Sequence, residues 1–249
     1  MIQHASLPFA FRDFERAKDV LRAAVCDHHE SYVLLTGDTG TGKTALLRQL
    51  RGEIDRARFR ILYFSQSRRL GAAGLVKVVG ESLRARISMC HSVSFDRLQR
   101  ALADQPQILL LWLDEAHALP EETRDEVQAL VESDLEGERR VQVLFAGMPR
   151  LRAELQSHGH LWRRIVVREE ITGLVLDELA GFLDHHFPSE QEGSGRLCER
   201  GLSALFERAK GAPGLILPMH RATLARAGRG KGKIDIAVVE GALERWDLE

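Results

Sequence analysis

The chain has 249 residues, of which 44% are hydrophobic and 29% are charged. This composition is ordinary for a protein that buries a core, and the length suffices for one large α/β domain and a small appended one. The formal net charge of −1 excludes a global basic field of the kind that drives nonspecific nucleic-acid binding, so a DNA site would have to be a local patch.

The first two thirds of the chain alternate short apolar strands with helices. Strands are predicted at Tyr32–Thr36, Arg60–Phe64, Ile108–Leu113, Val141–Ala146 and Arg164–Arg168. Helices are predicted after Lys43, over Leu75–Ile87, over Phe95–Ala103 with Ser94 as its N-cap, and from Pro120 onward. Strands separated by helices predict a parallel sheet with both faces covered.

From about Leu174 onward only helices are predicted. They cover Val175–Phe187, Gly201–Ala209, Leu215–Ala227 and Ile234–Trp246. We therefore expect an α/β P-loop domain over residues 1–173 and a helical lid domain over residues 174–249.

Three features favour a cytoplasmic protein. The longest apolar run, Ile108–Leu113, is far shorter than the ~20 residues that cross a bilayer. The N-terminal residues contain no apolar core typical of a signal peptide. The cysteines Cys26, Cys90 and Cys198 are far apart, which argues against a disulfide framework and for a reducing compartment.

A complete phosphate-binding motif follows the first predicted strand. It matches G-x-x-x-x-G-K-[ST] at every defined position, between a strand and a helix, as the motif requires. Its residues are Gly37, Asp38, Thr39, Gly40, Thr41, Gly42, Lys43 and Thr44. We expect the backbone N–H groups to surround a β-phosphate, Lys43 to bridge the β- and γ-oxygens, and the Thr44 hydroxyl to bind Mg²⁺. A glycine-rich turn without a ligand is the alternative.

Two adjacent acids end the strand Ile108–Leu113. We expect Asp114 to hold Mg²⁺ through water and Glu115 to act as the general base toward the attacking water. A solvated turn is the alternative, which the upstream phosphate motif disfavours. A GTPase is excluded because its guanine-recognition motif needs asparagine and the chain has none. The string Asp-Glu-Ala-His also occurs in helicases, but those need two core domains.

These motifs, their spacing and the helical tail resemble the AAA+ superfamily. The nearest resemblance is to ATPases of the secretion-ATPase-A/TnsC type, which include the phage Mu B protein and transposition target-selection ATPases. It covers roughly residues 8–245. It rests on Gly37–Thr44, Leu109–His117, Leu144–Leu151, Leu161–Ile165 and Gly211–Gly214. It implies an ATP- and Mg²⁺-dependent ATPase that forms a homo-oligomeric ring or spiral, assembles on double-stranded DNA and recruits or regulates a transposase or similar DNA enzyme.

The family pattern also implies contacts to the γ-phosphate. Arg164 matches the catalytic arginine that one subunit presents to a neighbour's ATP; Arg163 is its rival, and a surface ion pair is the alternative. The polar sensor after the fourth strand is replaced by Met148, and the sensor arginine of the lid by Gly214. Sensing is therefore expected to fall to Gln142 or a nearby backbone group, or to be weak.

DNA contacts are expected from local basic residues. The resemblance points to Arg68, Arg69 and Lys77, just beyond the second strand, as residues lining the pore of such assemblies. Arg226–Lys233 is a second basic string. Contacts of this kind neutralise phosphates without reading bases, so binding would be sequence-blind and salt-sensitive. Solvated surface charges and a flexible turn are the respective alternatives.

Two other functions stay open. One is a secretion-type ATPase that energises envelope assembly, although neither a membrane span nor a peptidoglycan-binding tail is recognisable in the sequence. The other is a nucleotide-gated signalling or scaffold switch that hydrolyses little ATP, which the substituted sensor positions favour.

Overall fold

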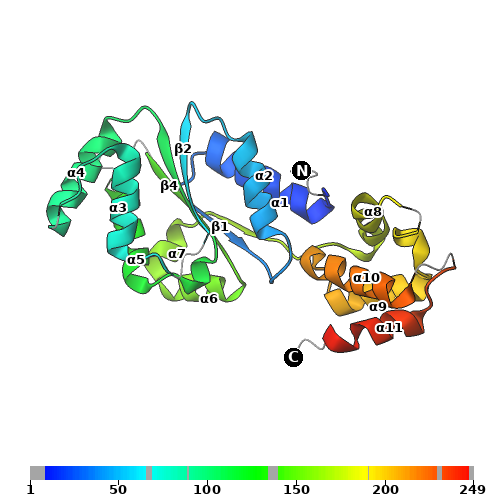
Figure 1. The fold of residues 1–249 in the computed structure, drawn as a ribbon. Coiled ribbons are helices and arrows are strands. Elements are labelled where there is room, and N and C mark those ends of the chain that lie inside the picture. The colour runs from blue at the N-terminus through cyan, green and yellow to red at the C-terminus, as the bar shows by residue number, and fades with distance from the viewer. Residues whose placement is uncertain are drawn as a thin grey trace. The chain divides into compact units, whose positions relative to one another are not determined.

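The computed structural model describes residues 9–65, 69–88, 90–133, 140–189, 191–228 and 232–246. The chain forms two compact units (Figure 1). The sheet unit consists of residues 17–37 and 47–170, and the loop–lid unit of residues 1–16, 38–46 and 171–249. The helices α1 (Arg12–Arg22) and α2 (Lys43–Glu53) each continue from the loop–lid unit into the sheet unit.

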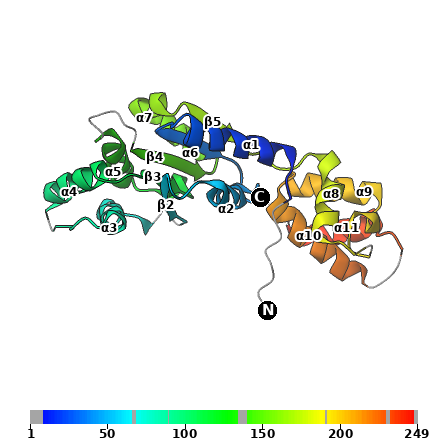
Figure 2. The same cartoon turned by 90° about the horizontal axis from the view of Figure 1, so that it is seen from above.

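The sheet unit is built on five parallel strands in the order β2-β3-β4-β1-β5. The strands are β1 (Tyr32–Thr36), β2 (Phe59–Phe64), β3 (Ile108–Leu113), β4 (Val141–Gly147) and β5 (Val167–Glu170). Figures 1 and 2 show them in two views at right angles. The predicted parallel α/β sheet is therefore confirmed.

The direction of each crossover decides which face its helix covers. The β1–β2 connection runs toward one edge of the sheet and the other three run toward the opposite edge, so right-handed crossovers put α2 on one face and the later helices on the other. Those later helices are α3 (Ala72–Leu83), α4 (His91–Ala103), α5 (Glu121–Glu132), α6 (Arg150–Ser157) and α7 (Gly159–Arg164). One core cluster joins all five of them to β1, β3 and β4.

Strand β3 shows why its sequence is apolar throughout. Leu109, Leu111 and Leu113 belong to the cluster formed with α3 to α7. Leu110 and Trp112 alternate with them and are equally buried, at 1% exposure each, so they point to the opposite face. A strand covered on both faces is typically a continuous apolar run, without the polar alternation of a half-exposed strand.

Four helices make up the lid part of the loop–lid unit: α8 (Leu176–His186), α9 (Glu199–Ala209), α10 (Pro213–Ala227) and α11 (Ile236–Leu243). The buried His220 of α10 packs edge-on against Phe187, and its Nε2 lies 2.6 Å from the Glu192 carbonyl oxygen. Burial lowers the pKa of His220, so the neutral ring donates this hydrogen bond.

Two local expectations are wrong. Helix α4 begins at His91 with Cys90 as its N-cap, and Ser94 lies buried within the helix. The Ser94 hydroxyl instead accepts from the Ser88 N–H at 2.9 Å, so it stabilises the loop before the helix. The fifth strand begins at Val167 because the preceding residues complete α7.

No helix in the described part of the chain is long and apolar enough to cross a membrane. The three cysteines are unpaired thiols. The described residues also contain no cluster of histidine, cysteine and acidic side chains that could hold a metal ion.

Candidate functional site

The phosphate motif begins where the sheet changes winding direction. Chain connections leave the adjacent strands β1 and β4 toward opposite edges, so their carboxyl ends flank a topological switch point, where open α/β sheets bind ligands. The first motif residue is anchored there, since the Gly37 N–H donates to the Gly147 carbonyl oxygen at 3.2 Å.

The loop between β1 and α2 has a conformation that its glycines permit. Gly40 and Gly42 have φ angles of 84° and 108°, in the left-handed region that other residues avoid. The loop closes around the Asp38 carbonyl oxygen, which accepts from the Thr41 hydroxyl at 2.9 Å and from Lys43 Nζ at 2.7 Å. The motif is thus folded as one turn that holds its lysine across the loop.

The charge at this turn matches an anionic ligand. Lys43 is the first residue of α2 and is only 6% exposed. A helix N-terminus carries a partial positive charge, which favours the binding of an anion there. The first turn of α2 contains no acidic residue. The turn therefore fits a phosphate group, which would be bound by both the backbone N–H groups and the ammonium.

Gly214, which stands where the family pattern has the sensor arginine of the lid, makes a backbone contact with the phosphate loop. The Gly214 N–H, at the start of α10, donates to the Gly40 carbonyl oxygen at 2.9 Å. A Cβ atom on Gly214 would lie 2.9 Å from the Gly40 Cα, closer than real Cβ atoms approach. Within the loop–lid unit, glycine at this position allows α10 to contact the phosphate loop directly.

Asp114 is buried at the carboxyl end of β3. It is 2% exposed, and its two oxygens accept from the Tyr63 hydroxyl at 2.8 Å and from the Glu115 N–H at 3.0 Å. Burial, with the hydrogen bond to Asp114, raises the pKa of the Tyr63 phenol, so Tyr63 stays a donor. These contacts fix the Asp114 carboxylate at the carboxyl end of β3. Because the strands are parallel, the carboxyl end of β1, which the phosphate motif follows, lies on the same side of the sheet.

Glu115 has a strained backbone and an accessible carboxylate. Its φ angle is 55°, in the left-handed region, which costs a non-glycine residue about 1–3 kcal/mol. Its side chain is 50% exposed, and Oε2 lies 3.4 Å from Nε2 of His117. Strain of this size at an acid beside a buried aspartate is typical of functional sites.

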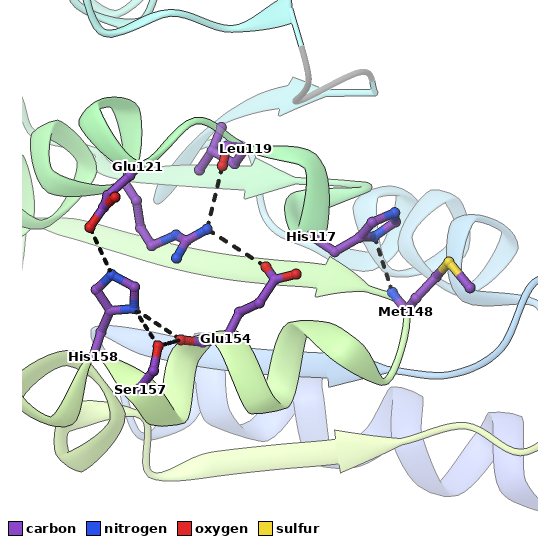
Figure 3. A network of polar contacts seen from close by, with 8 residues as sticks. His117, Leu119, Glu121, Met148, Glu154, Ser157 and His158 are labelled. Carbon is purple, nitrogen blue, oxygen red and sulfur yellow. Dashed lines mark hydrogen bonds and ion pairs between the residues drawn. The ribbon is translucent and has the colours of Figure 1, made fainter.

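The residue after β4 contacts the turn Ala116–Ala118 through its backbone N–H. The Met148 N–H donates to Nδ1 of His117 at 3.3 Å, as Figure 3 shows. Gln142 lies five residues before Gly147 on β4, about 17 Å away at ~3.3 Å per residue, near the amino end of the strand. The expectation that Gln142 senses the phosphate is therefore wrong, whereas sensing by a backbone group near Met148 stays a prediction.

Arg164 ends α7 and forms an ion pair with Glu132 at 2.6 Å. Its side chain is 51% exposed. Arg163 beside it is exposed as well. Both remain accessible to a second molecule, and the contact of Arg164 with a neighbour's ATP stays a prediction.

The predicted DNA residues fall in different places. Arg69 is exposed in the segment before α3, and the exposed Lys77 lies 4.0 Å from Glu81 on α3. Arg68 lies outside the described residues, as do residues 229–231 of the second basic string. A Cβ atom on Gly241 would lie 2.8 Å from the Arg226 guanidinium, so this arginine packs on α11.

A second basic feature, which the sequence reasoning missed, lies at the amino end of β2. This arginine pocket has a volume of about 280 Å³ and is lined by Arg51, Arg56, Phe59, Arg60, Ile61 and Gln107. No acidic residue lines it, and no ion pair is formed by Arg51 or Arg56 with any described residue. Its signal in the sequence is the run of arginines at 48, 51, 56, 58 and 60.

Acidic neighbours of the arginine pocket are engaged elsewhere. Glu53 pairs with Lys18 at 3.5 Å and accepts from the Gln49 amide. Asp55 accepts from the Ala57 N–H at 2.8 Å. Neither acid forms an ion pair with Arg51 or Arg56, and the pocket is lined by three guanidinium groups and no carboxylate.

Solved structures share this fold at low sequence identity. An Aeropyrum pernix ORC2 protein in ADPNP–ADP complexes is 14% identical with a TM-score of 0.64, covering 96% of this chain and 70% of that chain. A Thermotoga maritima RuvB variant is 16% identical with a TM-score of 0.63, covering 95% and 69%. A structure of Drosophila ORC bound to DNA is 17% identical with a TM-score of 0.68, and the match covers 98% of this chain and 62% of the Drosophila chain. At these identities the similarity establishes the fold.

No curated protein sequence matches the chain. A family model, described as an AAA domain, matches residues 26–155, which is more than half of the chain and includes the phosphate motif, Asp114 and Glu115. This match implies nucleotide binding. The chain belongs to the AAA domain family.

Proposed function

We propose that this chain is an AAA+ ATPase that binds and hydrolyses ATP·Mg²⁺, forms a homo-oligomer on double-stranded DNA and recruits or regulates a transposase-type partner. The observation that carries the ATPase is the complete phosphate motif, which is folded as one turn around the Asp38 carbonyl oxygen with Lys43 at the N-terminus of α2. Phosphate release from ATP by the purified chain, with and without Mg²⁺, tests it.

Each motif residue has a distinct task in this proposal. The loop Gly37–Thr44 binds the phosphates, with Lys43 neutralising the transferred group and Thr44 and Asp114 holding Mg²⁺. Glu115 accepts the proton of the attacking water. Mg²⁺, when bound, would neutralise negative charge on the phosphates.

The DNA part of the proposal is supported by local clusters of positive charge and not by net charge. The arginine pocket contributes three guanidinium groups, and Arg69 and Lys77 add exposed charges elsewhere on the sheet unit. The similar structures include one of Drosophila ORC bound to DNA. The transposase-type partner rests on the resemblance of the motifs alone.

Neutralising arginines of the pocket should weaken DNA binding and reduce its salt dependence. For Arg51→Gln/Arg56→Gln we expect the slope of log K against log [salt] to shrink by about 0.9 for each phosphate that the variant no longer neutralises. Fluorescence anisotropy with a labelled duplex at several salt concentrations measures this slope. Arg69→Gln/Lys77→Gln tests the pore residues in the same way.

The matched control is Arg97→Gln/Arg100→Gln, which removes two charges of exposed side chains on α4. If this control and the pocket variant lower affinity and slope equally, DNA responds only to overall charge. The arginine pocket would then have no specific part in DNA binding.

Hydrolysis should depend on subunit contacts if Arg164 completes a neighbour's site. Arg164→Ala and Lys43→Ala should each be inactive alone, and mixing them should restore part of the turnover, because mixed interfaces pair an intact loop with an intact arginine. An arginine supplied by a neighbouring subunit raises the rate of hydrolysis by about 10³–10⁵-fold. Phosphate release across a dilution series of each variant and of the mixture is the measurement.

Glu132→Gln separates this role from the ion pair within the chain. It breaks the contact with Arg164, which as an exposed pair contributes only about 0–1 kcal/mol, but it leaves the arginine available to a neighbour. Specific activity that is independent of concentration, with no rescue on mixing, would show that the site is complete within one chain. Arg163→Ala tests the rival residue.

A second candidate is a nucleotide-gated switch with slow hydrolysis. It is favoured by Met148 and Gly214 at the two sensor positions, where neither side chain can contact a phosphate oxygen by hydrogen bonding. The switch would be favoured over the ATPase proposed first if ATP binds tightly but single-turnover hydrolysis is slower than dissociation of the DNA complex.

A further inference from the structure

The turn after β3 contains a buried histidine placed between the predicted base and the end of β4. His117 lies in the short 3₁₀ turn Ala116–Ala118, and its side chain is only 6% exposed. One ring nitrogen lies near Glu115 and the other contacts the backbone of Met148. The ring therefore lies between two groups that follow different strands of the sheet, β3 and β4.

The contact with Met148 determines which nitrogen carries the proton. A backbone N–H can only donate, so Nδ1 accepts at 3.3 Å and carries no hydrogen. A neutral ring then carries its proton on Nε2, which lies 3.4 Å from Oε2 of Glu115. His117 thus accepts from the Met148 N–H, and its protonated Nε2 lies within contact distance of the Glu115 carboxylate.

The glycine at the end of β4 makes room for this ring. A Cβ atom on Gly147 would lie 3.1 Å from Nδ1 and 3.3 Å from the backbone nitrogen of His117. The carbonyl oxygen of the same glycine accepts from the Gly37 N–H. The 3.4 Å contact with Glu115, two hydrogen bonds and one residue of backbone therefore link Glu115, through His117 and the end of β4, to the first residue of the phosphate loop.

The surrounding turn is held in place by a second set of contacts, shown in Figure 3. Arg124 of α5 is 8% exposed; it donates to the Leu119 carbonyl oxygen at 3.4 Å and pairs with Glu154 of α6 at 3.7 Å. The segment after β3 is thereby fixed to the helix after β4, so the two ends of the His117 bridge are anchored.

We propose that His117 is a positioning residue for hydrolysis. The Met148 side chain cannot link β4 to the site by a hydrogen bond, and the contact of His117 with the Met148 backbone N–H makes this link instead. The bridge holds the half-exposed carboxylate of Glu115 in one orientation and couples it to the carboxyl ends of β4 and β1. This inference rests on the proposed function, since it requires Glu115 to act as the base.

Replacements of His117 that keep or remove the bridge test the proposal. Glutamine offers an acceptor oxygen and a donor N–H at similar reach, whereas phenylalanine keeps a ring of similar size with neither group. We expect His117→Phe to lower kcat by roughly 10- to 100-fold, as misplacement of a catalytic group does. The Kd for ATP and the unfolding temperature should change little, and His117→Gln should retain kcat within about threefold of the unmodified chain.

The Glu115→Gln background separates a positioning role from a packing role. If His117 acts through the carboxylate, adding His117→Phe to Glu115→Gln should cause no further loss of kcat, because coupled residues are not additive. A general effect of replacing a nearby histidine is excluded by a matched control, His158→Phe. This histidine contacts Glu121 and not Glu115, so its replacement should leave kcat unchanged.

Two results would overturn the inference, and a third would overturn the proposed function instead. Equal kcat in His117→Phe and the unmodified chain, or an undiminished loss in the Glu115→Gln background, would show that the bridge has no part in hydrolysis. If His117→Phe fails to fold, His117→Asn, which is too short to span both contacts, should give the same loss of kcat. Unchanged turnover in Glu115→Gln itself would remove the base on which the inference rests.

Discussion

Replacing Lys43 with alanine is expected to weaken ATP binding by roughly 30- to 4,000-fold and to abolish turnover. Removing one partner of a buried charge pair costs about 2–5 kcal/mol, which corresponds to that range of affinity. Stability should change little, since the loss of the hydrogen bond to the Asp38 carbonyl oxygen is offset by removal of a positive charge from the N-terminus of α2. Isothermal titration with ATP·Mg²⁺ and thermal unfolding without nucleotide measure both effects.

Lys18 provides a matched control because it is the other buried lysine of the chain's described part. It is 8% exposed, against 6% for Lys43, and pairs with Glu53. Lys18→Ala should lower the unfolding temperature but leave ATP affinity unchanged. The reverse pattern, with Lys43→Ala unstable and still binding ATP at normal affinity, would reduce the motif to a structural turn.

Replacing Glu115 with glutamine is expected to slow hydrolysis by about 10²–10⁴-fold while ATP still binds. A neutral amide cannot accept the proton of the attacking water, and general-base contributions have that size. The amide keeps the shape of the side chain, so the strained backbone, with φ at 55°, is retained. Single-turnover phosphate release, together with the Kd for ATP, separates chemistry from binding.

Glu122 on α5 is the control for this variant, because it is an exposed acid close by in sequence. Glu122→Gln should keep the turnover of the unmodified chain. If Glu115→Gln does so as well, another residue is the base. With Glu115 as the base, the Glu115→Gln protein should also remain on duplex DNA longer in the presence of ATP.

The parts of this protein that could be predicted from sequence are those encoded locally. The phosphate motif is contiguous, and the apolar runs Tyr32–Thr36 and Ile108–Leu113 are strands with the predicted bounds. The error at Ser94 has a local cause as well: a hydroxyl that satisfies backbone groups stabilises either a helix start or the loop before it. Sequence alone does not distinguish these two uses.

Contacts between distant segments were not predictable in the same way. Gly214 looks like the loss of a sensor, whereas in the structure it allows α10 to approach Gly40. The bridge from Glu115 through His117 to Met148 depends on the pairing of β3 with β4, which a single sequence does not specify. The arginine pocket likewise needs the ends of α2, β2 and β3 to be brought together by the sheet.

The central claim is that this chain hydrolyses ATP at a site completed by assembly. Its most direct test is the rate of phosphate release from ATP·Mg²⁺ per subunit, measured from dilute to concentrated protein with duplex DNA present. We predict a specific activity that rises with protein concentration, is stimulated by DNA and is absent from Lys43→Ala. Phosphate release no greater than that of Lys43→Ala at every concentration would contradict the claim.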